Sequence, residues 1–189
     1  MTGAPAHAGP GHNGGPSMEG GVSWRRHCWT QARERLLPTL PIEVVRLRVK
    51  RAAELGLDYK TYAGVRAATG HDIVAFLFSQ NALRLVPPAA LPPDRTARLA
   101  GITACGRIAL AQAARPEAVL AAASGLLDAA HPAPALLGSF AEARARLRDV
   151  LGSIPGDRVL LVGEHSLERD WVMAGRLAGW LPAERYFAG

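Results

Sequence analysis

A proline-rich stretch near the middle of the chain places the strongest limit on its secondary structure. Residues 86–93 contain four prolines among eight positions. Because proline fixes φ and has no backbone N–H to donate, neither a helix nor a central β-strand can run through this stretch. We therefore predict that residues 87–93 are a semi-rigid linker between a unit at 23–86 and a second unit at 94–189. The Gly- and Pro-rich residues 1–22 are expected to be a disordered tail.

The composition favours a mainly α fold. Alanine and leucine dominate, β-branched residues are sparse, and aromatic residues make up 6% of the chain. The apolar fraction of 49% is enough to form a core. Helices are expected at residues 24–37, 42–55, 59–69, 94–114, 117–130, 139–151 and 166–180. Asp58 is expected to cap the helix at 59–69, Gly56 and Gly70 to end the helices that precede them, and Glu142 to form a capping interaction with Ser139. In the helix at 42–55 the expected buried stripe is Ile42, Val45, Val49 and either Ala52 or Ala53.

Two short apolar segments keep a second fold class open. Residues 158–162 are expected to form a short strand, whereas residues 73–78 fit either a buried strand or, as we favour, a buried helical segment. A lone strand needs a partner, because its backbone groups must be paired. If both segments are strands they pair with each other, and the alternative to a mainly helical protein is a small α/β protein.

The excess positive charge lies in one part of the chain. Residues 24–66 hold ten basic and four acidic residues, so their net charge of +6 equals that of the whole protein. The part from residue 71 onward is close to neutral, with 12 arginines and 11 acidic residues. A concentrated basic segment indicates an anionic partner, which makes DNA or RNA the first expectation.

The pattern of residues 51–66 is typical of two short helices joined by a tight turn. Ala52 and Gly56 have the spacing that lets two helices approach and turn, and Leu55, Leu57 and Val65 supply apolar contacts. This segment resembles the helix-turn-helix unit of bacterial repressors. It departs from the pattern at two positions, where Arg51 and Tyr62 replace the usual apolar residues.

The resemblance implies a set of nucleic-acid-binding residues. Tyr59 and Lys60, at the start of the second helix, would face the major groove, and Arg66 would approach a phosphate. The preceding helix would bring Arg46, Lys50 and Arg51 to the nucleic-acid backbone. The main functional prediction is therefore a nucleic-acid-binding or transcription-regulatory protein.

Two other functions remain open at this stage. The first is a non-catalytic adaptor that binds another protein or a second copy of itself. The second is a small α/β enzyme with Glu164, His165 and Ser166 following the strand at 158–162, and with Asp170 one turn further on. No G-x-G-x-x-G, P-loop or nucleophile elbow accompanies these residues.

The cysteines and the apolar runs limit the remaining classes. Cys28 and Cys105 are the two cysteines of the sequence, and no C-x-x-C pair is present. Zinc ribbons and disulfide scaffolds are thereby excluded, so we predict no cofactor and no bound metal. No apolar run reaches the 18 or so residues that a membrane span needs, and the N-terminus lacks the apolar core of a signal peptide. We expect a cytoplasmic protein with no membrane partner.

Overall fold

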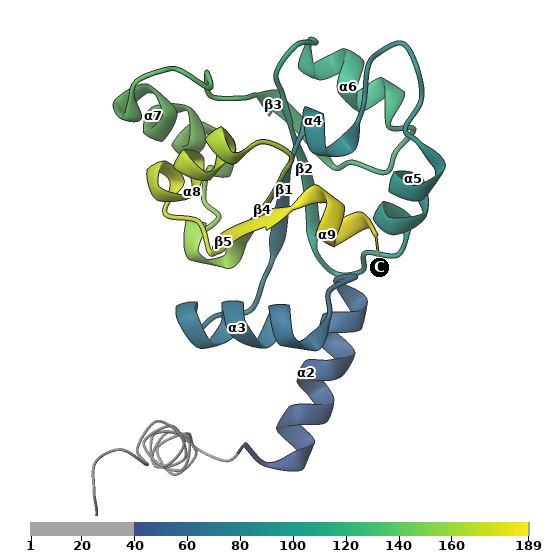
Figure 1. Ribbon diagram of the computed structural model, residues 1–189, viewed down its shortest axis with the longest axis vertical. Helices are drawn as coiled ribbons and strands as arrows, with labels where there is room; N and C mark the ends of the chain where they lie inside the picture. The colour runs from purple at the N-terminus through teal and green to yellow at the C-terminus, as the bar shows by residue number, and fades with distance from the viewer. Residues whose placement is uncertain (1–39, 189) are drawn as a thin grey trace, which may run out of the picture. The chain divides into compact units, whose positions relative to one another are not determined.

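Five short apolar segments form a parallel β-sheet in the computed structural model, which describes residues 40–188. The strands are β1 (Ala75–Ser79), β2 (Gly106–Ala111), β3 (Ala129–Pro132), β4 (Val159–Gly163) and β5 (Gly179–Pro182). Their order across the sheet is β3-β2-β1-β4-β5, so β1 lies at the centre (Figure 1). The predictions for the tail at 1–22 and the helix at 24–37 lie outside the described residues.

The prediction of a mainly α fold is wrong, and the strands explain why. Strands of a parallel sheet are buried on both faces and therefore read as continuous apolar runs, without the alternation that identifies a half-exposed strand. In this Ala-rich chain such runs resemble buried helix. The helix predicted at 94–114 is in fact α5 (Pro93–Ala100) followed by β2, and the end of the helix predicted at 117–130 belongs to β3. The end of the helix predicted at 166–180 likewise lies in β5.

The alternative pairing of the two apolar segments matches the centre of the sheet. Phe76 of β1 lies beside Leu160 of β4, and Phe78 beside Val162. On its other side β1 pairs in parallel with β2, where Leu77 lies opposite Ile108. The protein is thus a doubly wound α/β protein.

Eight helices alternate with or precede these strands in the described residues. Two precede the sheet, α2 (Ile42–Glu54) and α3 (Tyr59–Thr69). The others are α4 (Gln80–Leu83), α5, α6 (Pro116–Ala122), α7 (Phe140–Leu151), α8 (Asp170–Gly175) and α9 (Ala183–Phe187). Two 3-10 turns, Gly156–Arg158 and Ser166–Arg169, flank β4. The predicted capping interaction of Ser139 with Glu142 at the start of α7 is confirmed.

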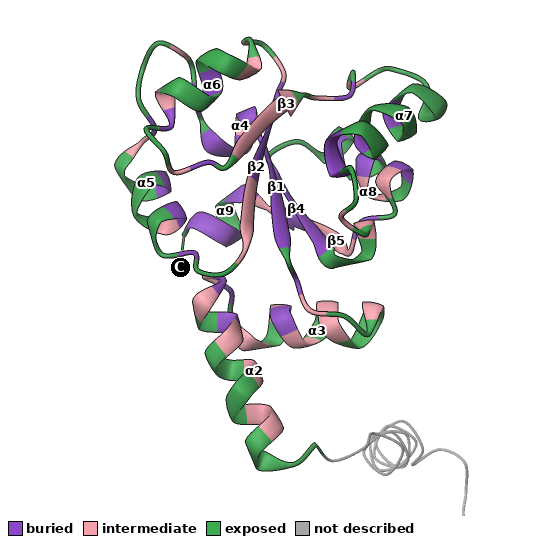
Figure 2. Cartoon of the chain, turned by 180° about the vertical axis from the view of Figure 1, so that it is seen from behind, coloured by how far each residue is buried: buried purple, intermediate pink, exposed green. Residues whose placement is uncertain are grey.

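The core consists of one apolar layer on each face of the sheet. Alternate residues of β1 point to opposite faces: Phe76 and Phe78 contribute to one layer, and Ala75 and Leu77 to the other. Helices α5, α6 and α9 cover the first layer, and α7 and α8 cover the second (Figure 2). The sheet is therefore enclosed on both sides, as a parallel sheet requires.

Residues 42–188 lie in one compact unit. The proline-rich residues 87–93 connect α4 to α5 within it. Strand β1 precedes this stretch in sequence, yet it pairs with β2 and β4, which follow it. The segments before and after residues 87–93 consequently share one sheet and one core.

The α2–α3 pair lies at the end of the unit where the strands begin. Asp58 caps α3 by accepting a hydrogen bond from the Thr61 N–H, as predicted, and Gly70 ends the helix in the left-handed region. Gly56, with φ of +65°, makes the turn between the two helices. Only the end of α2 is anchored, through Ala52 and the following Leu55, while its first turns project away from the sheet (Figures 1 and 2).

Candidate functional site

The strand order reverses at the carboxyl ends of β1 and β4. The chain passes from β1 outward through β2 and β3, and then returns to place β4 on the other side of β1. In open α/β sheets this reversal point is where ligands usually bind. Polar residues follow each strand here: Gln80 and Asn81 after β1, Gln112 after β2, and Glu164 and His165 after β4.

A completely buried carboxylate joins the three strand ends. Glu168, in the 3-10 turn after β4, has 0% of its surface exposed. Its Oε1 accepts hydrogen bonds from Asn81 Nδ2 at 3.3 Å and from Gln112 Nε2 at 3.1 Å. Its Oε2 accepts from the backbone N–H of Glu164 at 2.8 Å and of His165 at 3.4 Å. Four donors from three segments therefore converge on one side chain.

A second buried polar side chain, that of Gln80, forms hydrogen bonds with the backbone N–H groups of the loop after β2. Gln80 Oε1 accepts from the backbone N–H groups of Gln112, Ala113 and Ala114 at 2.8 to 3.2 Å. Its Nε2 donates to the Leu85 carbonyl at 2.9 Å. Backbone N–H groups ahead of a helix are the donors that would hold an anionic ligand. Here the carbonyl oxygen of Gln80 already occupies them.

The space beneath the β4 end is fully occupied. A Cβ atom at Gly163 would overlap both Glu168 Oε2 and Trp180 Nε1. The Trp180 N–H is buried and has no hydrogen-bond partner among the described residues, and its ring lies 4.2 Å from the Arg169 guanidinium. The glycine is needed because any side chain would displace the buried carboxylate. Glu168 thus occupies the place that an oxyanion of a ligand would take.

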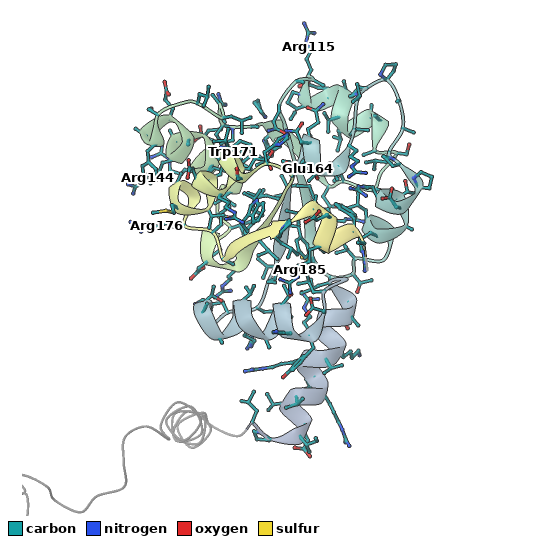
Figure 3. All side chains as sticks on the ribbon, in the orientation of Figure 1. Arg115, Arg144, Glu164, Trp171, Arg176 and Arg185 are labelled. Carbon is teal, nitrogen blue, oxygen red and sulfur yellow. The ribbon has the colours of Figure 1, made fainter. Side chains whose placement is uncertain are left out.

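The enzyme candidates predicted after β4 do not converge. His165, Ser166 and Asp170 are exposed, and the Glu164 side chain is 32% exposed. Glu164 lies 3.8 Å from Arg84, at the edge of the sheet (Figure 3). Within residues 40–188, no three His, Cys, Asp or Glu side chains are grouped in a way that could hold a metal ion.

Sequence reasoning missed the residues that do converge at this edge, which are Glu168, Asn81 and Gln112. A signal was present for two of them, because Asn81 and Gln112 each follow closely on an apolar run. Interpreting residues 73–83 and 94–114 as helices hid the fact that both follow strand ends. Glu168 was masked by its position in a charged segment that reads as exposed helix.

The predicted nucleic-acid-binding residues have different environments. Arg46, Lys50 and Lys60 are exposed, whereas Tyr59 and Arg66 are half-buried. Lys50 lies 4.0 Å from Glu54 of the same helix. These five residues all lie on α2 and α3, but the outward side of α3 holds mostly small residues, such as Gly64, Ala67 and Ala68.

Arg51 is held by the body of the protein. Its side chain is 16% exposed and forms ion pairs with Asp72 at 3.0 Å and with Glu54 at 3.2 Å. It also donates to the backbone carbonyls of Ile73 at 3.0 Å, Thr103 at 3.3 Å and Ala104 at 3.0 Å. Tyr62, the other departure from the helix-turn-helix pattern, is buried and donates its hydroxyl to Asp72 at 2.8 Å. The two departures therefore anchor the helix pair to the sheet.

The predicted buried stripe of α2 is largely exposed. Ile42 is 59% exposed and Val49 is 48% exposed, while Val45 between them is half-buried. Of the predicted stripe, Ala52 alone is buried, because α3 and the sheet reach only the end of the helix. Residues three and four apart share one side of a helix, so Ile42, Val45 and Val49 form one apolar surface, here called the α2 stripe. Arg46 and Lys50 border it on one side and Arg48 on the other.

No helix among residues 40–188 is both long enough and apolar enough to cross a membrane. No family model, curated protein or solved structure matches this chain.

Proposed function

We propose that this protein is a non-catalytic interaction protein, and that its α2 stripe binds an apolar groove with an acidic rim on a partner protein. The observation that carries the proposal is the exposure of two large apolar side chains of this stripe, Ile42 and Val49, on the projecting turns of α2. Amphipathic helices commonly bind partners by laying such a stripe into an apolar groove.

Rigid anchoring of the helix supports this use. Arg51 fixes the end of α2 to the loops around Ile73 and Thr103 through an ion-pair and hydrogen-bond cluster. Because the projecting turns extend from that anchored end, the stripe is already helical before any partner arrives. A preformed helix loses less conformational entropy on binding than a segment that must fold first.

The charges beside the stripe determine which kind of partner fits. Arg46, Arg48 and Lys50 border it, against Glu43 at the start of the helix. Pairing two copies of α2 through this surface would bring basic residues together, which disfavours a homodimer. An acidic rim on the partner complements the three cations.

The filled edge of the sheet supports a non-catalytic role. The carboxylate of Glu168 and the amide of Gln80 satisfy the backbone N–H groups that face the reversal point. A ligand there would have to displace a buried carboxylate with four hydrogen-bond donors, which is costly. The fold then serves as a scaffold that presents α2, in a compartment that we take to be the cytoplasm.

Nucleic-acid binding is the competing function. It is favoured by the exposure of Arg46, Lys50 and Lys60, and it is opposed by the apolar residues between those cations, since phosphate contacts come from charged and polar groups. Both functions use the same helix, so one experiment has to separate them.

The test is site-specific photo-cross-linking in the cells that make the protein, with a benzophenone amino acid at position 49. We expect one protein adduct whose cross-linked peptide is rich in apolar and acidic residues. The double variant Arg46→Glu, Lys50→Glu should abolish that adduct. The matched control Arg115→Glu, Arg146→Glu makes the same change in charge at exposed sites elsewhere and should leave the adduct intact. A cross-linker at Met173, which is exposed on α8, should not give the adduct.

The other outcomes overturn the proposal. An adduct with a second copy, or within the same chain, would assign the stripe to self-contact. An adduct that survives charge reversal would show that binding does not need an acidic rim on the partner. If position 49 gives no protein adduct, and the purified protein binds random duplex DNA with a steep salt dependence that Arg46→Glu, Lys50→Glu removes, the nucleic-acid function replaces this one.

A further inference from the structure

A shallow hollow lies between α7 and the end of α8. Its volume is about 210 Å³. Arg144 and Arg148 of α7 and Arg176 after α8 line it, together with the apolar side chains of Leu151, Ile154 and Ala174. Figure 3 shows Arg144 and Arg176 on the same side of the molecule. Three arginines and three apolar residues therefore line one small hollow.

These three arginines lack the ion pairs and ring contacts that several other arginines in the described residues form. Arg51, Arg107 and Arg185 form ion pairs with carboxylates, and Arg169 stacks on a tryptophan ring. None of the ion pairs found within residues 40–188 includes Arg144, Arg148 or Arg176. Arg144 and Arg148 are four residues apart on one helix, where like charges repel. An anion from solution would neutralise this cluster.

The hollow has two features that select the anion. Guanidinium groups bind phosphate through paired N–H donors, which gives them an advantage over a point charge. The apolar residues between them offer contact to a carbon skeleton and nothing to a second charged group. We propose that this hollow binds a small phosphate monoester, with the phosphate on the three arginines and the organic group on Leu151, Ile154 and Ala174.

The geometry also explains the glycines at its edge. Gly152 and Gly175 belong to the lining. Gly152 has φ of +54° and ψ of −112°, a conformation that a residue with a side chain rarely adopts. A Cβ at Gly175 would lie 3.0 Å from Leu177 Cδ2 and 3.1 Å from Leu147 Cδ1, so close packing against the apolar layer keeps this position a glycine.

The test is isothermal titration of the full chain with phenyl phosphate, inorganic phosphate and benzyl alcohol at low ionic strength. We expect phenyl phosphate to bind at least several-fold more tightly than inorganic phosphate, and benzyl alcohol not to bind. Arg144→Ala and Arg176→Ala should each weaken phenyl phosphate binding about tenfold, the usual effect of losing a charged hydrogen bond. Arg176→Lys should weaken it as well, because the charge stays but the paired donors are lost.

The control is Arg146→Ala, which removes one exposed arginine from the same helix outside the hollow. It should leave the affinity within twofold. Equal losses for Arg146→Ala and Arg144→Ala would show general attraction to a basic surface and would overturn the site. Equal affinities for phenyl phosphate and inorganic phosphate would overturn the assignment to a monoester, and so would the absence of binding at millimolar ligand. Thermal unfolding of each variant establishes that the variant is folded, so that a loss of phenyl phosphate affinity reflects the site.

Discussion

At the scale of single residues, a comparison of Arg51 with Arg46 distinguishes an arginine that anchors α2 from an exposed one. Its guanidinium contacts two carboxylates and three carbonyls and is mostly buried. We expect Arg51→Met to lower the free energy of unfolding by about 3 kcal/mol, because it removes the ion pair to Asp72 and leaves the three carbonyls without their donor. Arg46→Met, at an exposed site, should change it by less than about 0.5 kcal/mol. Urea unfolding of both variants checks this, and equal effects would contradict the anchoring role.

Cys105 should be chemically inert. Burial raises the pKa of the Cys105 thiol to about 12, so almost none of it is thiolate at pH 8. In a Cys28→Ser variant, which leaves Cys105 as the one thiol of the chain, we expect alkylation by iodoacetamide to be about a thousandfold slower than for a free cysteine. Mass spectrometry of the intact protein follows the reaction. Unfolding the protein in guanidinium chloride should restore the ordinary rate of alkylation. Rapid alkylation without the denaturant would contradict the burial of this thiol.

Residue-scale predictions from the sequence succeeded where the signal was local. Asp58 and Ser139 were expected to cap helices, Gly56 and Gly70 were expected to end them, and the structure confirms all four. The anchoring role of Arg51 could not be predicted, because Asp72, Thr103 and Ala104 lie far from it in sequence. A charged residue within a basic segment reads as exposed, and its contacts exist only after the sheet has formed.

At the scale of secondary-structure elements, the glycines of the α2–α3 pair should respond in opposite directions. Gly56 has φ of +65°, and a Cβ there would lie 3.0 Å from Arg98 Cδ. We expect Gly56→Ala to lower the free energy of unfolding by about 1 to 2 kcal/mol. Gly64 is inside α3, and a methyl group added to it would meet nothing within 4 Å, so Gly64→Ala should raise the free energy of unfolding by about 0.5 to 1 kcal/mol. Thermal and urea unfolding measure both variants. A change of the same sign in the two free energies of unfolding would contradict the turn at Gly56.

Glu168 links three elements, and its removal should be costly. Glu168→Ala leaves the side-chain amides of Asn81 and Gln112 and two backbone N–H groups without an acceptor in a buried place. We expect a loss of about 3 kcal/mol in the free energy of unfolding. Formate at tens of millimolar should restore part of it in this variant and none in the parent protein. The same loss without any response to formate would contradict the placement of an oxyanion at this edge.

The helix-or-strand question shows why the elements were only partly predictable. Residues 158–162 were recognised as a strand because they are rich in valine and leucine and follow a turn. β2 contains two alanines and a glycine among its six residues, and β3 contains two alanines and a proline among its four. Local propensity therefore opposes the strands that form. β2 pairs with β1, and β3 pairs with β2, and these tertiary interactions override propensity. Apolar runs buried on both faces carry no period from which this could be recognised.

At the scale of the whole molecule, the candidate site depended on knowing the topology. Glu164 and His165 were placed at a strand end from the sequence, and the structure puts them beside the reversal point of the sheet. The side chains that fill that point are Asn81, Gln112 and Glu168, which follow β1, β2 and β4 and lie more than thirty residues apart in sequence. The α2 stripe was recognised as apolar, but its exposure follows from how little of the molecule reaches the first turns of α2.

The C-terminal helix should make residues 42–188 unfold as one. Tyr186 packs against Phe76 and Phe78 of the central strand, and its hydroxyl donates to the Leu55 carbonyl at the end of α2, at 3.0 Å. Tyr186→Ala removes contacts that join the segments before and after residues 87–93. We expect it to lower the free energy of unfolding by about 3 to 5 kcal/mol. If the molecule is one cooperative unit, hydrogen exchange of the most protected amides in α3 and in β4 should accelerate by the same factor. Met173→Ala, at an exposed site, should accelerate neither. Acceleration confined to α3 or to β4 would mean that the α2–α3 pair opens independently of the sheet.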